Sequence, residues 1–345
     1  MPRLQDMPSL IKRRIADNLD SYVDKMFLRT ACPHFHTTIG HVHFETSIQL
    51  SLRNFRDWVE LKFCDSWSYY QNENGCQVTI RAWRRGIIHN FVEGGDCIEL
   101  AIKNFAMLVD NPNLRIKCFE VSVEGNPARF LAKLQDLLMK VKLKVAKFEM
   151  KFAGDQSDLL HILPHLDSEA LKSLKLTGPR FTYVYFQFDE LVKLKQWKTL
   201  EKLEMFEHRG SKIEHWWDIP DIEMERIYAS PKDMQRLLKH FRTAPNFKSA
   251  NIQRTGYNTA YLVYILQGWG ACYWRPYEHR HQFQLPRTPT KNGLHVETSC
   301  DSIRIRKRSV EVEEDDDWLF DDTTWAKRGL ILAAGILFFV KIGFR

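Results

Sequence analysis

The sequence has few cysteines, and none of its seven forms a C-x-x-C pair. Their odd number and scattered positions argue against a disulfide framework, so we expect reduced thiols and a cytoplasmic or nuclear location. Arg3, Asp6 and Lys12 interrupt any apolar run at the start, so no signal peptide is predicted there. The cysteines are Cys32, Cys64, Cys76, Cys97, Cys118, Cys272 and Cys300.

Motifs for catalysis and phosphate binding are also missing. The chain contains no G-x-S-x-G turn, no H-E-x-x-H helix and no glycine-rich phosphate loop, and Gly94-Gly95 is an isolated turn signal. No cysteine–histidine pair stands out among seven cysteines and 13 histidines. We therefore predict no enzyme activity, no catalytic residue and no cofactor.

Two further kinds of site are not predicted. The formal charge of +7 is spread along the chain rather than gathered in a basic stripe with stacking aromatics, so nucleic acid is not an expected partner. A cluster of metal-ligand types occurs early, but its spacing fits no zinc framework and surface histidines explain it more simply. The cluster contains Cys32, His34, His36, His41 and His43.

Residues 7–36 carry a short helical pattern. Ile11, Ile15 and Leu19 recur at helical spacing, and Pro8 suits the first turn of a helix. Helices this short bury too little apolar surface to fold alone, so they need the rest of the chain or a partner. One interpretation is a helical cap on a larger domain.

The order of these residues resembles an F-box, with Met7-Pro8 at its start and Leu28-Arg29-x-x-Cys32-x-x-Phe35 at its end. Met7 stands where the family usually has leucine. The resemblance implies docking to a Skp-type adaptor and, through it, to a cullin ubiquitin ligase. The implied adaptor-binding residues are Pro8, Leu10, Ile11, Ile15, Leu19, Leu28, Cys32 and Phe35.

The middle of the chain repeats a strand-like pattern. Apolar and charged residues alternate in segments around Phe119, Phe148, Leu174 and Leu203, at steps of 29, 26 and 29 residues. Amphipathic helices are expected between them, with Asn126 capping one and Ser230 starting another. This cadence predicts a leucine-rich-repeat-like α/β solenoid, with an ordinary α/β domain as the alternative.

A second resemblance lies in this region. Gln196-Trp197-Lys198 with the following Leu200–Leu203, the Ile162-Leu163-Pro164 segment, and Ser230 to Phe247 are similar to the FTH-type region of nematode F-box A proteins. The F-box-like and FTH-like segments occur in the family's order. Together they imply a substrate-recognition subunit of a Skp–cullin–F-box ligase. The alternative is a non-ligase repeat scaffold or protein-interaction module.

The repeats would present a protein-binding face to an unknown substrate. Charged residues at alternating strand positions are the candidates, although they could equally serve only to solubilise the sheet. The candidate substrate-binding residues are Glu149, Lys151, Lys175, Glu204 and Arg226.

The C-terminal part changes character. A basic run and then an acidic run, Glu311 to Asp322, predict a solvated linker. The apolar residues 329–344 are short for a membrane span, which needs about 20 residues. They predict either a tail anchor with the body facing the cytosol, or a terminal helix that packs on the body or a partner.

These segments define the expected fold class, α+β or α/β, with a three-helix F-box-like module followed by the solenoid. The expected parts are a helical module at 1–45, a connecting α/β region at 46–114, an FTH-like repeat domain at 115–267, an irregular charged linker at 268–324 and a hydrophobic segment at 325–345.

Overall fold

A computed structural model of the chain divides it into two units, residues 1–307 and residues 308–345. The second unit lies outside the residues that the structure describes. The described residues are 8, 10–11, 14–15, 44–53, 58–63, 65–82, 86–111, 114–151, 157–178, 184–185, 188–206, 208–209, 212–227, 230–254, 266, 272–277, 280–285, 293–299 and 302–307.

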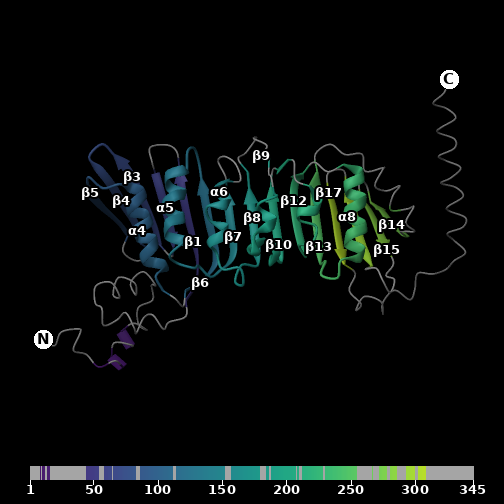
Figure 1. Cartoon of the computed structure of the whole chain (residues 1–345), viewed down its shortest axis with the longest axis horizontal. Helices are drawn as coiled ribbons and strands as arrows, with labels where there is room; N and C mark the ends of the chain where they lie inside the picture. Colours follow the sequence, from purple (N-terminus) through teal and green to yellow (C-terminus); the bar gives the residue numbers. More distant parts are fainter. Residues whose placement is uncertain are drawn as a thin grey trace, which may run out of the picture. The chain divides into compact units, whose positions relative to one another are not determined.

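One mixed sheet of 15 strands organises the first unit (Figure 1). Its central part, the parallel segment, contains seven strands that all run in the same direction. In sheet order these are β1 (Phe44–Arg53), β6 (Leu114–Val123), β7 (Val145–Lys151), β8 (Ser173–Thr177), β10 (Lys202–Phe206), β12 (Asp221–Ile227) and β13 (Ser249–Arg254).

An antiparallel wing continues the sheet on each side of the parallel segment. The first wing contains β2 (Trp58–Phe63), β3 (Asp65–Asn72), β4 (Gly75–Ala82) and β5 (Gly86–Glu93). The second wing contains β17 (Ser302–Lys307), β16 (Leu294–Ser299), β15 (Arg280–Leu285) and β14 (Cys272–Tyr277). A separate two-stranded sheet pairs β9 (Val184–Tyr185) with β11 (His208–Arg209).

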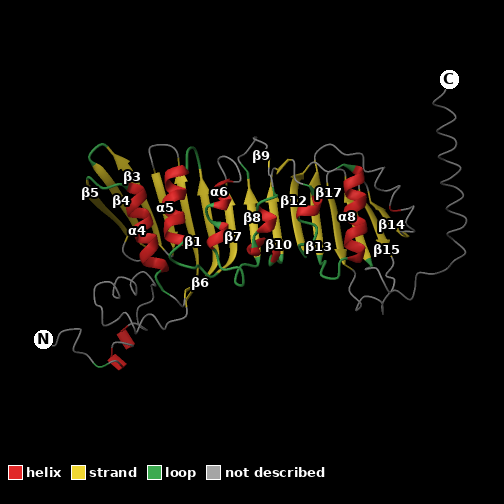
Figure 2. Cartoon of the chain, in the orientation of Figure 1, coloured by secondary structure: helices red, strands yellow, loops and turns green. Residues whose placement is uncertain are grey.

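The helices between residues 97 and 243 lie on one face of the large sheet (Figure 2), and we call the opposite face the open face. Three of them are longer than one turn: α4 (Cys97–Val109), α5 (Ala128–Leu138) and α8 (Pro231–Thr243). The short ones are α6 (Ser157–Leu160), η3 (Leu163–His165), η4 (Leu191–Lys193), α7 (Lys195–Lys198) and η5 (Ile213–His215).

The core lies between the sheet and these helices. Because side chains alternate along a strand, every second residue faces the helices, and these positions are apolar. Phe119, Phe148, Leu174 and Leu203 are direct cross-strand partners, which confirms the alignment predicted from the sequence. The full row is Ile48, Phe119, Phe148, Leu174, Leu203, Ile222, Ala250 and Ile305, and each member is at most 1% exposed.

The helix starts differ from one another. Ser230 and Asp233 form the predicted capping box of α8, each side chain accepting the other residue's backbone N–H. The cap of α5 is Pro127 rather than the predicted Asn126, whose side chain instead accepts the N–H of Ala128 at 3.3 Å.

The predicted fold class is wrong. The described residues form a large mixed sheet with few helices, not a three-helix module followed by a repeat solenoid. In the described parts of the connections after β7, β8 and β10, the helices are single turns of α-helix or 3₁₀-helix, so regular strand–helix repeats do not form there. The strands predicted around Phe119, Phe148, Leu174 and Leu203 are present as β6, β7, β8 and β10 and lie side by side in sequence order.

The second wing lies where an irregular linker was predicted. Strands β14 to β17 occupy parts of residues 272–307, and β17 pairs with β13 of the parallel segment. Leu294, Val296, Ile303 and Ile305 alternate with polar residues and are fully buried. The basic residues between them suggested a solvated linker, but they occupy the outward positions of strands.

Candidate functional site on the open face

Charged side chains line the open face of the parallel segment. They occupy the strand positions that alternate with the core row, so the register places them directly opposite one another. We call this line the polar row. Its members are Gln49, Glu120, Glu149, Lys175, Glu204, Glu223, Asn251 and Arg304.

Glu204 is the most enclosed charge of the polar row, with a side chain only 10% exposed. Three lysines surround its carboxylate: Lys202 of the same strand at 3.0 Å, Lys147 of β7 at 3.6 Å and Lys175 of β8 at 3.7 Å. A carboxylate taken this far from water needs such partners, because an unpaired buried charge is strongly unfavourable. The three lysines therefore supply the paired charges for the Glu204 carboxylate in the middle of the face.

Glu149 shares two of these lysines. Its carboxylate lies 2.9 Å from Lys147 and 3.9 Å from Lys175. Burial raises the pKa of Glu149, but the hydrogen bond from Lys147 and the two lysine charges outweigh burial, and the net pKa lies below its usual value. The same contacts act on Lys147, whose pKa lies above its usual value although burial alone would lower it.

The only described thiol on this part of the face is chemically quiet. Cys118 donates a weak hydrogen bond to Glu149 at 3.6 Å. Burial, aided by that carboxylate, raises the pKa of Cys118 to about 11. Since the thiolate is the reactive form, Cys118 is no nucleophile near neutral pH.

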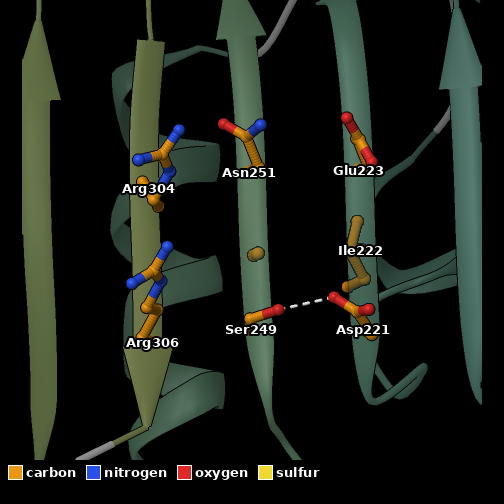
Figure 3. Close-up of a pocket in the computed structure, with 8 residues that line it drawn as sticks. Asp221, Ile222, Glu223, Ser249, Asn251, Arg304 and Arg306 are labelled. Carbon is orange, nitrogen blue, oxygen red and sulfur yellow. Dashed lines mark hydrogen bonds between the residues drawn. The ribbon is translucent and has the colours of Figure 1, made fainter.

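A hollow of about 290 Å³ lies where the parallel segment meets the second wing (Figure 3). Arg304 and Arg306 on β17 form one side, and Asp221 and Glu223 on β12 form the other. The smaller side chains of β13 lie between them, and Ser249 donates a hydrogen bond to Asp221 at 2.5 Å. The hollow thus presents a cationic wall and an anionic wall across one neutral strand.

The structure brings most predicted substrate-binding residues together. Glu149, Lys175 and Glu204 are consecutive members of the polar row. Lys151 lies on the same face and forms an ion pair with Glu120 at 2.5 Å. Arg226 lies within β12, but its side chain is outside the described part of the chain.

The residues of the hollow were not predicted. Arg304 and Arg306 were assigned to the linker, and Asp221 and Glu223 were not among the candidate substrate-binding residues. The apolar alternation of Ile303 and Ile305 was the available signal for β17, since it leaves the two arginines on the opposite face.

The predicted adaptor-binding residues are only partly described. Leu10 is 65% exposed and Ile11 is 42% exposed, and the N–H of Ile11 donates to the carbonyl of Pro8 at 3.0 Å. Ile15 is half-buried. Leu19, Leu28, Cys32 and Phe35 lie outside the described residues. The exposed pair is compatible with a helix that needs a partner.

Two other kinds of site are absent from the described part of the chain. It contains no group of three histidine, cysteine or acidic side chains placed to hold a metal ion. None of its helices combines the length and apolarity that crossing a membrane requires. The cluster from Cys32 to His43 and the hydrophobic residues 329–344 both lie outside the described ranges.

Comparisons with known proteins find a family match for the part of the chain that contains β7, β8, β10, β12 and β13 of the parallel segment. Residues 128–267 match the model of the FTH domain. F-box A protein 224 of Caenorhabditis elegans is 28% identical over 195 residues, and the match covers 47% of this chain and 49% of that protein, about half its length. No solved structure matches. The predicted resemblance is therefore confirmed for the FTH-type region: residues 128–267 match the FTH domain, and the chain is similar to a nematode F-box A protein.

Proposed function

We propose that this protein is a substrate-recognition subunit of a Skp–cullin–F-box ubiquitin ligase. Its N-terminal helices bind a Skp-type adaptor, which connects it to the cullin. The open face of the parallel segment binds a protein substrate. The family relationship supports an F-box-type interaction or adaptor role rather than catalysis, and the adaptor, cullin and substrate are our proposal.

The observation that carries the proposal is the position of the polar row. Glu149, Lys175 and Glu204 lie within residues 128–267, the part that matches the FTH domain. The helices cover the other face of these strands, so this face is free of described helices (Figure 2). A wide face with fixed, alternating charges suits recognition of a protein surface with the opposite pattern.

The proposed mechanism is positioning. A substrate held on the open face has its lysines near a charged ubiquitin-conjugating enzyme on the same complex, which raises their effective concentration. No group on the face needs to react. The closely paired lysines and carboxylates instead supply a preorganised surface, which lowers the cost of binding.

The adaptor-binding part is tested with the purified full chain and a purified Skp-type adaptor. A charge at Ile15, as in Ile15→Asp, is expected to abolish the complex, because truncation or charge at an apolar anchor costs about 2 kcal/mol or more. Met139→Asp is the control: Met139 is 67% exposed, and it lies just after α5. An adaptor complex that survives Ile15→Asp, with folding verified, would contradict the proposal and favour a scaffold outside a ligase.

Localisation follows from the same proposal. We expect the protein in the cytoplasm or nucleus, where cullin ligases act on soluble substrates. The alternative is a membrane-tethered adaptor held by residues 329–344. Removing residues 325–345 distinguishes the two, because only a tethered protein would be released from the membrane fraction.

A further inference from the structure

Strand β5 is an exposed edge of the large sheet. It is the last strand in the sheet order, and among the described residues it pairs only with β4. All eight of its residues are exposed, including Ile87 at 59%, Phe91 at 52%, Ile88 at 38% and Val92 at 37%. The backbone N–H and C=O groups on its outer side are a template for a further strand.

The two edges of the sheet are protected to different degrees. Strand β14, at the other edge, contains Arg275 and Pro276, and charges and proline are common devices against edge pairing. Strand β5 has the sequence Gly-Ile-Ile-His-Asn-Phe-Val-Glu, with no proline, lysine or arginine. An edge of this length that carries four large apolar side chains is a site for a partner strand.

The side chains of β5 divide between the two faces of the sheet. Ile88 and Val92 lie opposite Ile80 and Cys76, so they extend the helix-covered face. Ile87, His89 and Phe91 lie on the open face. There, exposed Arg81 is the direct neighbour of Ile87.

We propose that the partner is β5 of a second copy of this chain, paired antiparallel about a two-fold axis through Asn90. This register places Ile88 opposite Val92 of the second copy, and Phe91 opposite its His89. It also places Glu93 of the second copy opposite Ile87. The strand that carries this Glu93 lies two strand spacings, about 10 Å, from β4, which carries Arg81. The two long side chains can span that distance. Symmetry makes each contact occur twice.

Charge complementarity selects a second copy over an unrelated apolar strand. Within one chain, the direct neighbour of Arg81 on β5 is Ile87 rather than an acidic residue. In the dimer, Glu93 of the other copy supplies the negative charge. The helix-covered face also receives two apolar pairs, because Ile88 of each copy meets Val92 of the other across the new strand pair. The dimer joins two sheets into one and presents two open faces, whatever each open face binds.

Sedimentation equilibrium of the full chain over about 1 to 100 μM tests the dimer. The wild-type chain should dimerise, and Ile88→Lys should raise the dimer dissociation constant at least about tenfold, because it places a charge at both symmetric apolar pairs. Met139→Lys, which changes an exposed apolar residue away from β5, should leave it unchanged. A wild-type monomer at the highest concentration, or an unaltered Ile88→Lys dimer, would overturn the proposal.

Cysteine cross-linking tests the register. In the proposed pairing only residue 90 lies directly opposite itself, so Asn90→Cys should form an intermolecular disulfide under mild oxidation and His89→Cys should not. The wild-type chain is the control for the native thiols, of which Cys76 and Cys97 are buried. Cross-linking through residue 89 instead, or through neither residue, would overturn the two-fold at Asn90.

Discussion

The parallel segment and the first wing belong to the same sheet but complete their surfaces in different ways. In the parallel segment the core row is at most 1% exposed, and the charges on the open face are paired with one another. In the first wing the apolar side chains of β5 remain exposed at the sheet edge. Charges on the parallel segment are thus paired within the chain, whereas the apolar side chains at the β5 edge remain exposed. A partner strand can complete the sheet at that edge.

The largest difference between the two regions should appear in stability. Phe148 is fully buried at the end of an aromatic series, 5.6 Å from the ring of Phe119. Phe148→Ala should lower the free energy of unfolding by about 3 to 5 kcal/mol, because it leaves a cavity in a packed core. Ile87→Ala, on exposed β5, should change it by less than about 0.5 kcal/mol. Urea denaturation measures both unfolding free energies, and equal losses in the two variants would contradict the difference between the packed core and the exposed edge.

The next effect concerns the enclosed charge of the polar row. Glu204→Gln leaves Lys147, Lys175 and Lys202 around a neutral group and should destabilise the fold by about 1 to 3 kcal/mol, since the lysines remain partly solvated. Glu201→Gln is the matched control, because the Glu201–Lys172 pair at 3.3 Å is half-exposed. The control should change stability by less than about 0.5 kcal/mol. If Glu204→Gln lowers the unfolding free energy no more than Glu201→Gln, the three lysines and Glu204 do not stabilise the fold as a network.

A smaller effect is expected at the start of α8, one of the helices that cover the parallel segment. Ser230→Ala removes the capping box and should cost about 1 kcal/mol in unfolding free energy. Asn126→Ala, beside α5, should cost less, because its side chain bonds only the adjacent Ala128 N–H at 3.3 Å. Thermal and urea unfolding compare the two variants, and the reverse order would contradict the caps as described.

The smallest effect is a dependence on pH that belongs to the polar row. The pKa of Glu149 is lower in the folded chain than its ordinary 4.5, so the ionised carboxylate stabilises the fold above that pH. This stabilisation is lost as the pH falls through the lowered folded pKa. Glu149→Gln should therefore flatten the acid side of the stability profile, measured between about pH 2 and pH 7. A profile as steep as that of the wild type would rule out this contribution.

The sequence predicted the parallel segment better than the wings. The alternation around Phe119, Phe148, Leu174 and Leu203 is strong because side chains toward the helices are apolar and side chains toward the open face are charged. The second wing was missed because its arginines resembled a linker. The predicted fold class was wrong because the spacing between strands in the sequence does not show how few helical residues connect them.

The site was predictable to a similar extent. Glu149, Lys175 and Glu204 follow from alternation alone, and the structure adds that they are direct neighbours. The hollow could not be predicted, because Arg304 joins Asn251 and Glu223 only through the pairing of β17 with β13, across more than 50 residues. Such long-range pairing has no local sequence signal.

The most direct test of the central claim measures which proteins are ubiquitylated in cells that express the chain. Lys151→Glu/Lys175→Glu reverses two charges of the open face and leaves the N-terminal helices unchanged. We predict that the double variant still co-purifies with the Skp-type adaptor while the proteins whose ubiquitylation depends on the wild-type chain lose that modification. The same proteins modified to the same extent by the variant would contradict recognition through the open face.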